Sequence, residues 1–100
     1  MSLYYVQKLL YQLNRDPVLR RCYEEKPDEV VGEYELSTEE LDALRQRDIG
    51  LLYVIGVNGQ LLMHFAAMCG VAWPDYIEAM REGVRRHGPV RAGIYAMVKD

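Results

Sequence analysis

His64 and His87 are the side chains of this sequence best suited to acid–base or metal chemistry, and they are its only histidines. A non-haem iron(II) site needs two histidines and one carboxylate on one face, and Asp48 or Asp75 is able to supply that carboxylate. The histidines lie on separate segments, however, without the i, i+4 spacing that brings two ligands to one helix face. The sequence therefore predicts that this chain binds no metal and no other cofactor of its own.

Nucleophilic side chains are equally sparse. The serines are Ser2 and Ser37, and the cysteines are Cys22 and Cys69, which form no C-x-x-C motif. A single disulfide is one interpretation of the cysteine pair, but two reduced thiols in a cytosolic protein are expected. Because no Ser–His or Cys–His pair is evident, we expect no catalytic residue in this chain and no enzyme activity from it alone.

Two polar residues interrupt the apolar centre of the sequence. Asp48 falls on the apolar side of a predicted helix, where a buried carboxylate is costly unless it is hydrogen-bonded. It is either a structural anchor for a backbone N–H or an arginine, or it faces a cleft or a partner chain. Asn58 lies in the Gly-Val-Asn-Gly turn at residues 56–59, where it either caps the next helix or presents its amide to a ligand.

Residues 49–74 form an uncharged window, with no Asp, Glu, Lys or Arg in a chain that is 27% charged. The window is either the centre of the core or a surface that another chain covers. It is too interrupted for a membrane span, which needs about 20 unbroken apolar residues, because the turn at residues 56–60 and His64 divide it. The sequence also lacks a recognisable signal peptide, so we predict a cytoplasmic protein with no membrane partner.

Charge is unevenly distributed along the chain. Residues 24–48 carry ten acidic and three basic side chains, whereas residues 81–100 carry five basic and two acidic ones. Four arginines and His87 gather after residue 80; they are either the basic end of a helix or a site for phosphate or an acidic partner. A helix-turn-helix DNA-binding role is disfavoured by the net charge of −3, so we predict no nucleic-acid partner.

Proline, glycine and capping residues divide the sequence into short helices. Ser37 and Glu40 give the most specific signal, a capping box that opens a helix. Predicted helices cover about residues 3–13, 17–26, 27–31, 38–55 and 59–69, and a last one runs from Pro74 to near Gly83. We therefore predict an all-α fold, a compact orthogonal bundle of five to seven short helices. The helical domain is expected at residues 1–83, followed by a basic C-terminal tail at residues 84–100 that is able to dock through its apolar part, residues 94–98.

Five segments, in their order and spacing, resemble one family. They are residues 15–20 (RDPVLR), 26–31 (KPDEVV), 34–40 (YELSTEE), 43–48 (ALRQRD) and 52–58 (LYVIGVN). The sequence resembles the small (alpha) subunit of the protocatechuate 4,5-dioxygenase type of extradiol ring-cleavage enzymes, over about residues 6–80. None of these segments is a catalytic motif.

The resemblance implies a helical subunit without metal ligands. A separate large subunit would hold Fe(II) through two His and a Glu and add dioxygen to a catechol, and the small subunit would be a lid over that active site. By resemblance, the substrate-lid or partner-facing residues are Asn58, Met63, His64 and Phe65. The chain departs from the larger family members after Asn58, where it passes almost directly to the next helix.

We therefore predict a non-catalytic small subunit of an Fe(II) extradiol aromatic-ring-opening dioxygenase. Its expected partner is the catalytic large subunit, or another biosynthetic enzyme. The alternative is a stand-alone helical interaction module that binds a peptide or a biosynthetic enzyme through the apolar helical hairpin between Asp48 and Trp73. The isolated chain is also able to form a homodimer through an uncovered apolar surface.

Overall fold

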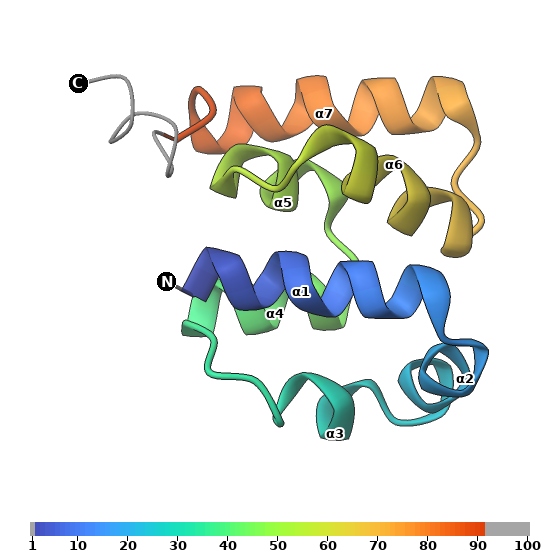
Figure 1. Cartoon of the computed structure of the whole chain (residues 1–100). Coiled ribbons are helices and arrows are strands. Elements are labelled where there is room, and N and C mark those ends of the chain that lie inside the picture. Colours follow the sequence, from blue (N-terminus) through green and yellow to red (C-terminus); the bar gives the residue numbers. More distant parts are fainter. Residues whose placement is uncertain (1, 92–100) are drawn as a thin grey trace.

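The computed structural model describes residues 2–91, and this part of the chain folds into seven α-helices without any β-strand (Figure 1). The helices are α1 (Ser2–Arg15), α2 (Pro17–Glu25), α3 (Pro27–Val31), α4 (Thr38–Gln46), α5 (Ile49–Ile55), α6 (Gly59–Met68) and α7 (Trp73–His87). In Figure 1 α5, α6 and α7 form an upper layer over α1 and α4, and α2 is seen nearly end-on, across the direction of α1. The predicted all-α orthogonal bundle is confirmed.

Side chains at the helix starts explain where most helices begin. The Asp16 carboxylate accepts hydrogen bonds from the backbone N–H groups of Val18 and Leu19, and Pro17 occupies the first turn. At α4 the Ser37 hydroxyl accepts from the Glu40 N–H at 3.2 Å, and the Glu40 carboxylate accepts from the Ser37 N–H at 2.8 Å. Both hydrogen bonds of a capping box are therefore present, and they satisfy N–H groups that a helix start leaves unpaired.

Substituting Ser37 tests the contribution of this capping box. Ser37→Ala is expected to lower the free energy of unfolding by about 1 kcal/mol, because the Glu40 N–H loses its acceptor at the start of α4. Ser37→Asp supplies an alternative acceptor and is the matched control, expected to retain most of the stability. Urea denaturation of the three proteins measures the difference; equal losses in both variants would contradict the capping explanation.

The single helix predicted over residues 38–55 is wrong, because the chain breaks at Arg47. Arg47 takes a left-handed conformation with φ 55°, and Asp48 then starts α5 by accepting a hydrogen bond from the Leu51 N–H at 3.1 Å. A helical apolar spacing continues across the break, so periodicity alone did not reveal it. An aspartate inside such a pattern competes with helix continuation by offering its side chain as a cap.

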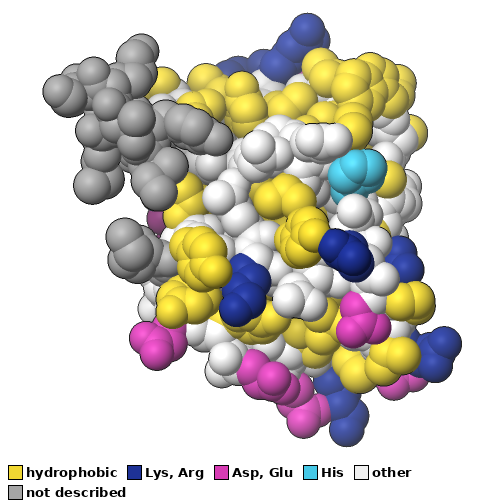
Figure 2. Space-filling view, in the orientation of Figure 1, with side chains coloured by type: hydrophobic (Ala, Val, Ile, Leu, Met, Phe, Trp, Pro, Cys, Tyr) yellow, Lys and Arg dark blue, Asp and Glu magenta, His cyan; other side chains and the backbone are white. Residues whose placement is uncertain are grey.

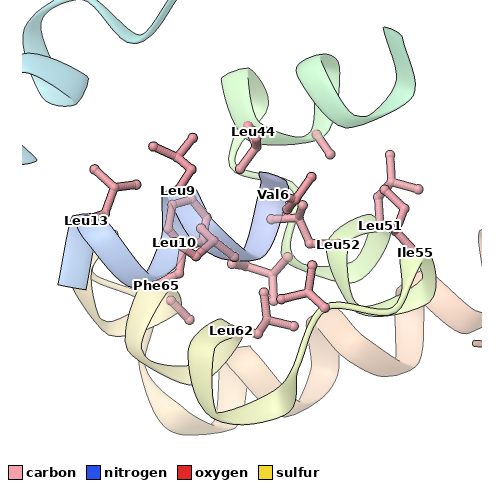
Figure 3. Packing of buried hydrophobic residues seen from close by; sticks show 14 of the residues in the cluster. Val6, Leu9, Leu10, Leu13, Leu44, Leu51, Leu52, Ile55, Leu62 and Phe65 are labelled. Atoms are coloured by element: carbon pink, nitrogen blue, oxygen red, sulfur yellow. The ribbon is translucent and has the colours of Figure 1, made fainter. Parts of the chain in front are cut away.

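The core lies between the two layers, and α1, α4, α5 and α6 supply most of it. Figure 3 shows Val6 and Leu10 of α1 meeting Leu52 of α5 and Leu62 of α6. The largest fully buried side chains are Tyr23, Leu9, Leu10, Leu13, Leu44, Leu52, Leu62, Val6, Val31 and Val54. Six of the seven residues of α5 are buried, so the first part of the uncharged window is core.

Helices α5 and α7 make the most extensive helix–helix contact of the fold, at a point where two glycines meet. A Cβ atom added to Gly50 would lie 2.5 Å from the Ala79 carbonyl oxygen and 2.8 Å from the Gly83 Cα atom. One added to Gly83 would collide with the Gly50 backbone. The two helix backbones therefore pack directly against each other, which only glycine permits at these positions.

The last helix ends at His87, four residues beyond the end predicted near Gly83. It continues because Gly83 is the contact point with α5 rather than a helix terminator. After α7 the Arg91 N–H donates to the Val54 carbonyl at 2.8 Å. The residues of the predicted tail beyond Arg91, including the apolar stretch at 94–98, lie outside the described residues. Within the described part, no helix has the length and hydropathy needed to cross a membrane.

Candidate partner-facing surface

One side of α6 carries an uncharged, solvent-facing set of side chains, here called the α6 strip. Gln60, His64 and Ala67 are exposed at i, i+4, i+7 spacing, and Met63 is half-buried beside them. The opposite side of α6, with Leu62, Phe65 and Ala66, points into the core. Most exposed helix surfaces of this chain carry charge, so an uncharged strip is a candidate for contact with another molecule.

The turn before the strip is held in place by two side chains. The Asn58 side-chain oxygen accepts hydrogen bonds from the N–H groups of Gln60, at 2.9 Å, and Leu61, at 3.2 Å. The Asn58 N–H in turn donates to the Gln7 side chain of α1 at 2.6 Å. The Asn58 oxygen is thus committed to capping α6, and the turn presents an exposed but fixed edge to a partner.

The four residues predicted to face a substrate or partner divide into two groups. Asn58 and His64 are exposed, and Met63 is half-buried and packs partly against the core. Phe65 is only 3% exposed, and its ring lies 6.1 Å from that of Tyr23. The structure corrects the placement of Phe65 on the partner-facing surface. Phe65 lies one position beyond His64 on α6, and its side chain points into the core.

Trp73 is a surface residue that the sequence reasoning missed. It is 60% exposed at the start of α7, and its ring lies 5.5 Å from that of Tyr76. The Tyr76 hydroxyl donates to the Gly59 carbonyl at 3.2 Å, which ties the first turns of α7 to the beginning of α6. A tryptophan just before the proline of a helix start, inside an uncharged window, was the signal available in the sequence. Exposed Trp is enriched among residues that dominate binding energies.

Acidic side chains gather on one side of the molecule. In Figure 2 they lie in the lower half of the visible face, whereas hydrophobic side chains are spread over the whole face, with basic ones among them at the top and in the middle. The lower part corresponds to the region of α2 and α3 in Figure 1. There the sequence is densest in Glu and Asp, and the acidic region and the α6 strip are therefore distinct surfaces.

A buried tyrosine, Tyr23, packs against Phe65 of α6. Tyr23 is fully buried, and its hydroxyl donates to the Leu44 carbonyl at the end of α4. The Arg47 guanidinium lies 5.0 Å from the centre of the Tyr23 ring, and the Phe65 ring of α6 lies 6.1 Å from the same ring. Burial raises the pKa of Tyr23 to about 12, despite the nearby Arg47. The phenol is therefore a neutral structural donor rather than a proton-transfer group at neutral pH.

A second feature is a polar cleft of about 380 Å³ between the start of α5 and one face of α7. Its charged and titratable lining residues are Arg47, Asp48, Asp75, Glu82, Arg86 and His87. His64 is absent from this lining, so the structure does not bring the two histidines together with Asp48 or Asp75. Among residues 2–91, no three His, Cys, Asp or Glu side chains are grouped as a metal site would require.

The two cysteines are the remaining nucleophile candidates. Cys22 and Cys69 are both free thiols, the first exposed and the second half-buried. Burial raises the pKa of the Cys69 thiol, which disfavours the reactive thiolate.

Comparison with known proteins gives one match. Residues 6–85 match the family model described as "Aromatic-ring-opening dioxygenase LigAB, LigA subunit". The match spans α2 to α6 completely, together with most of α1 and α7. Neither curated proteins nor solved structures gave a significant match.

Proposed function

Because this chain belongs to the LigA family, the small subunit of an aromatic-ring-opening dioxygenase, we propose that it is the helical lid over the active site of a separate catalytic subunit. The family is that of a subunit that pairs with a catalytic one. The proposed contact surface is the α6 strip with Asn58 at its start and Trp73 beside it. The single observation that carries this assignment is the α6 strip, which carries no charge in a chain that is 27% charged.

The physical character of this surface suits a lid. Interface centres are depleted in charge and enriched in aromatic residues and methionine, and the surface offers Trp73, Met63 and His64 without a neighbouring carboxylate or ammonium group on α6. A lid with such a surface removes water from the site it covers and brings no competing charge to it. The fixed Asn58 turn keeps the strip in one orientation, which lowers the conformational cost of docking.

The ring-opening chemistry is assigned to the partner. We propose an extradiol reaction that depends on Fe(II) held by the catalytic subunit, since residues 2–91 of this chain contain no donor set that fits a metal ion. This chain's contribution is to exclude solvent and to position substrate through a few side chains of the α6 strip. A cytoplasmic location follows as part of this proposal.

Co-purification from the native cytosol tests the assignment. The tagged chain is expected to retain a larger subunit, and the pair is expected to cleave a catechol in the presence of Fe(II). This chain alone is expected to show no such activity. Recovery of this chain alone, or with a peptide-modifying enzyme, would replace the lid assignment with that of a stand-alone interaction module.

Substitutions on the contact surface test its location. Trp73→Ala is expected to weaken binding to the catalytic subunit roughly 30-fold, as for a binding hot spot worth about 2 kcal/mol. His64→Glu is expected to weaken it as well, because it places a charge in the centre of the strip. Affinity is measured by titration of the purified subunits, with thermal unfolding to show that each variant is folded.

The control is Glu33→Lys, a larger charge change than His64→Glu, at an exposed position in the acidic region. It is expected to change the affinity less than twofold. If Glu33→Lys weakens binding and the two α6-side variants do not, the acidic region is the docking surface and the lid orientation proposed here is wrong.

A further inference from the structure

A shallow apolar groove lies beside the α5–α7 contact, on the other side of that contact from the polar cleft. Its lining residues are Tyr53 of α5 and Ile77, Met80, Arg81 and Val84 of α7, and its volume is about 380 Å³. Helical periodicity places residues 77, 80, 81 and 84 on one face, away from the face of residues 75, 79, 82 and 86 that lines the cleft. The side chain of Val84 is 38% exposed. This apolar surface is separate from the α6 strip and is unexplained by the lid proposal.

Arg91 fixes the point from which the rest of the chain continues. Its N–H donates to the Val54 carbonyl at 2.8 Å. This carbonyl lies in the last turn of α5, where carbonyl groups have no N–H partner within the helix. Its guanidinium grips the Glu39 carboxylate with two hydrogen bonds, of 2.5 and 2.9 Å. The Glu39 hydrogen bonds raise the pKa of Arg91, and those from Arg91 lower the pKa of Glu39. The backbone is thereby attached to Val54, the residue that follows the groove-lining Tyr53 in the sequence.

We propose that the C-terminal segment of this same chain, residues 94–98, occupies the groove. Residues 92–98 (AGIYAMV) contain no charged side chain, although 27% of the whole chain is charged. Five residues span roughly 16 Å when extended, and the groove follows α7 from Ile77 to Val84, a rise of roughly 10 Å. Ala92 and Gly93 provide the link from Arg91. Because Arg91 tethers the segment, its local concentration at the groove is on the order of millimolar, above that of any free partner.

Methionine methyl groups report this contact directly, because the chain has only five methionines. Met80 lines the groove and Met97 lies in the segment, while Met63 and Met68 are elsewhere and serve as internal controls. In the full chain labelled with ¹³C-methyl methionine, a cross-relaxation signal is expected between the Met97 methyl and groove protons. Ile94→Asp is expected to abolish that signal and to move the Met80 resonance, with Met63 and Met68 unchanged.

Two further full-length variants sharpen the test. Lys99→Glu changes a charge next to the apolar run and is expected to leave Met80 in place. Glu39→Gln removes the charged partner of Arg91 and is expected to move Met80 in the same direction as Ile94→Asp, by a smaller amount. The proposal is overturned by a Met80 resonance that ignores Ile94→Asp, by one that moves with protein concentration and so reports a second copy, or by one that responds only to added catalytic subunit.

Discussion

Replacing Gly50 with alanine is expected to lower the free energy of unfolding by about 2 kcal/mol or more. The added methyl group would lie 2.5 Å from the Ala79 carbonyl oxygen and 2.8 Å from the Gly83 Cα atom. Both are backbone atoms, so no side-chain rotation relieves the overlap, and helices α5 and α7 must separate. This cost opposes the gain of up to about 1 kcal/mol that alanine otherwise has over glycine within a helix.

The measurement is urea and thermal denaturation of the variant beside the unmodified protein. The expected loss corresponds to a fall in Tm of roughly 10 °C for a domain of this length. Gly83→Ala is expected to behave alike, because its methyl group would meet the Gly50 backbone. The matched control is Gly59→Ala at the exposed start of α6, where an added Cβ has no atom within 4 Å. That variant is expected to be neutral or slightly stabilised, and a Gly50→Ala protein as stable as Gly59→Ala would contradict the backbone contact.

Raising the pH from 9 to 12 is expected to remove about 2–3 kcal/mol of stability through Tyr23 alone. Burial raises the pKa of Tyr23 to about 12 in the folded protein, whereas an exposed tyrosine ionises near pH 10. Between these values the unfolded chain has released the phenolic proton and the folded chain still holds it. The unfolded state therefore gains stability as pH rises, and the contribution is complete below pH 10 and lost as pH approaches 12.

Tyr23→Phe separates this contribution from other alkaline effects. At pH 7 the variant is expected to be less stable by about 1 kcal/mol, because the Leu44 carbonyl loses the Tyr23 hydroxyl and keeps only the Arg47 N–H as a donor. Burial also raises the pKa of Tyr34, Tyr76 and Cys69, and these groups keep a pH dependence in the variant. The stability gap between the two proteins is therefore expected to narrow from pH 7 to pH 11. A constant gap across that range would contradict a buried, neutral Tyr23 phenol.

Much of the fold is predictable from the sequence because residues close in the sequence determine where its helices start. Asp16 before Pro17, the Ser37–Glu40 pair and Asn58 each satisfy backbone N–H groups within three residues, so their roles depend on no distant contact. The break between α4 and α5 at Arg47 is not predictable in the same way. Its left-handed backbone is stable only in the folded setting, where the guanidinium packs over Tyr23 from a separate helix.

The candidate surface was only partly predictable for a related reason. Lack of charge marks both a core and an interface, and the sequence does not say which side of α6 faces inward. The structure places Phe65 in the core and leaves His64 exposed, although the two are adjacent. Trp73 was overlooked because a large aromatic residue in an apolar stretch is more often buried; here it remains 60% exposed at a helix start.

The glycine crossing also has a consequence for the order of events during synthesis. A ribosome makes α5 well before α7, so a nascent chain that ends near residue 70 has the Gly50 backbone without its covering helix. Arg91 contacts Glu39 and Val54, so these contacts form only after the chain has been made through residue 91. Folding of this domain therefore waits until the residues through Arg91 have been made, and shorter nascent chains keep an uncovered α5 that chaperones are suited to shield.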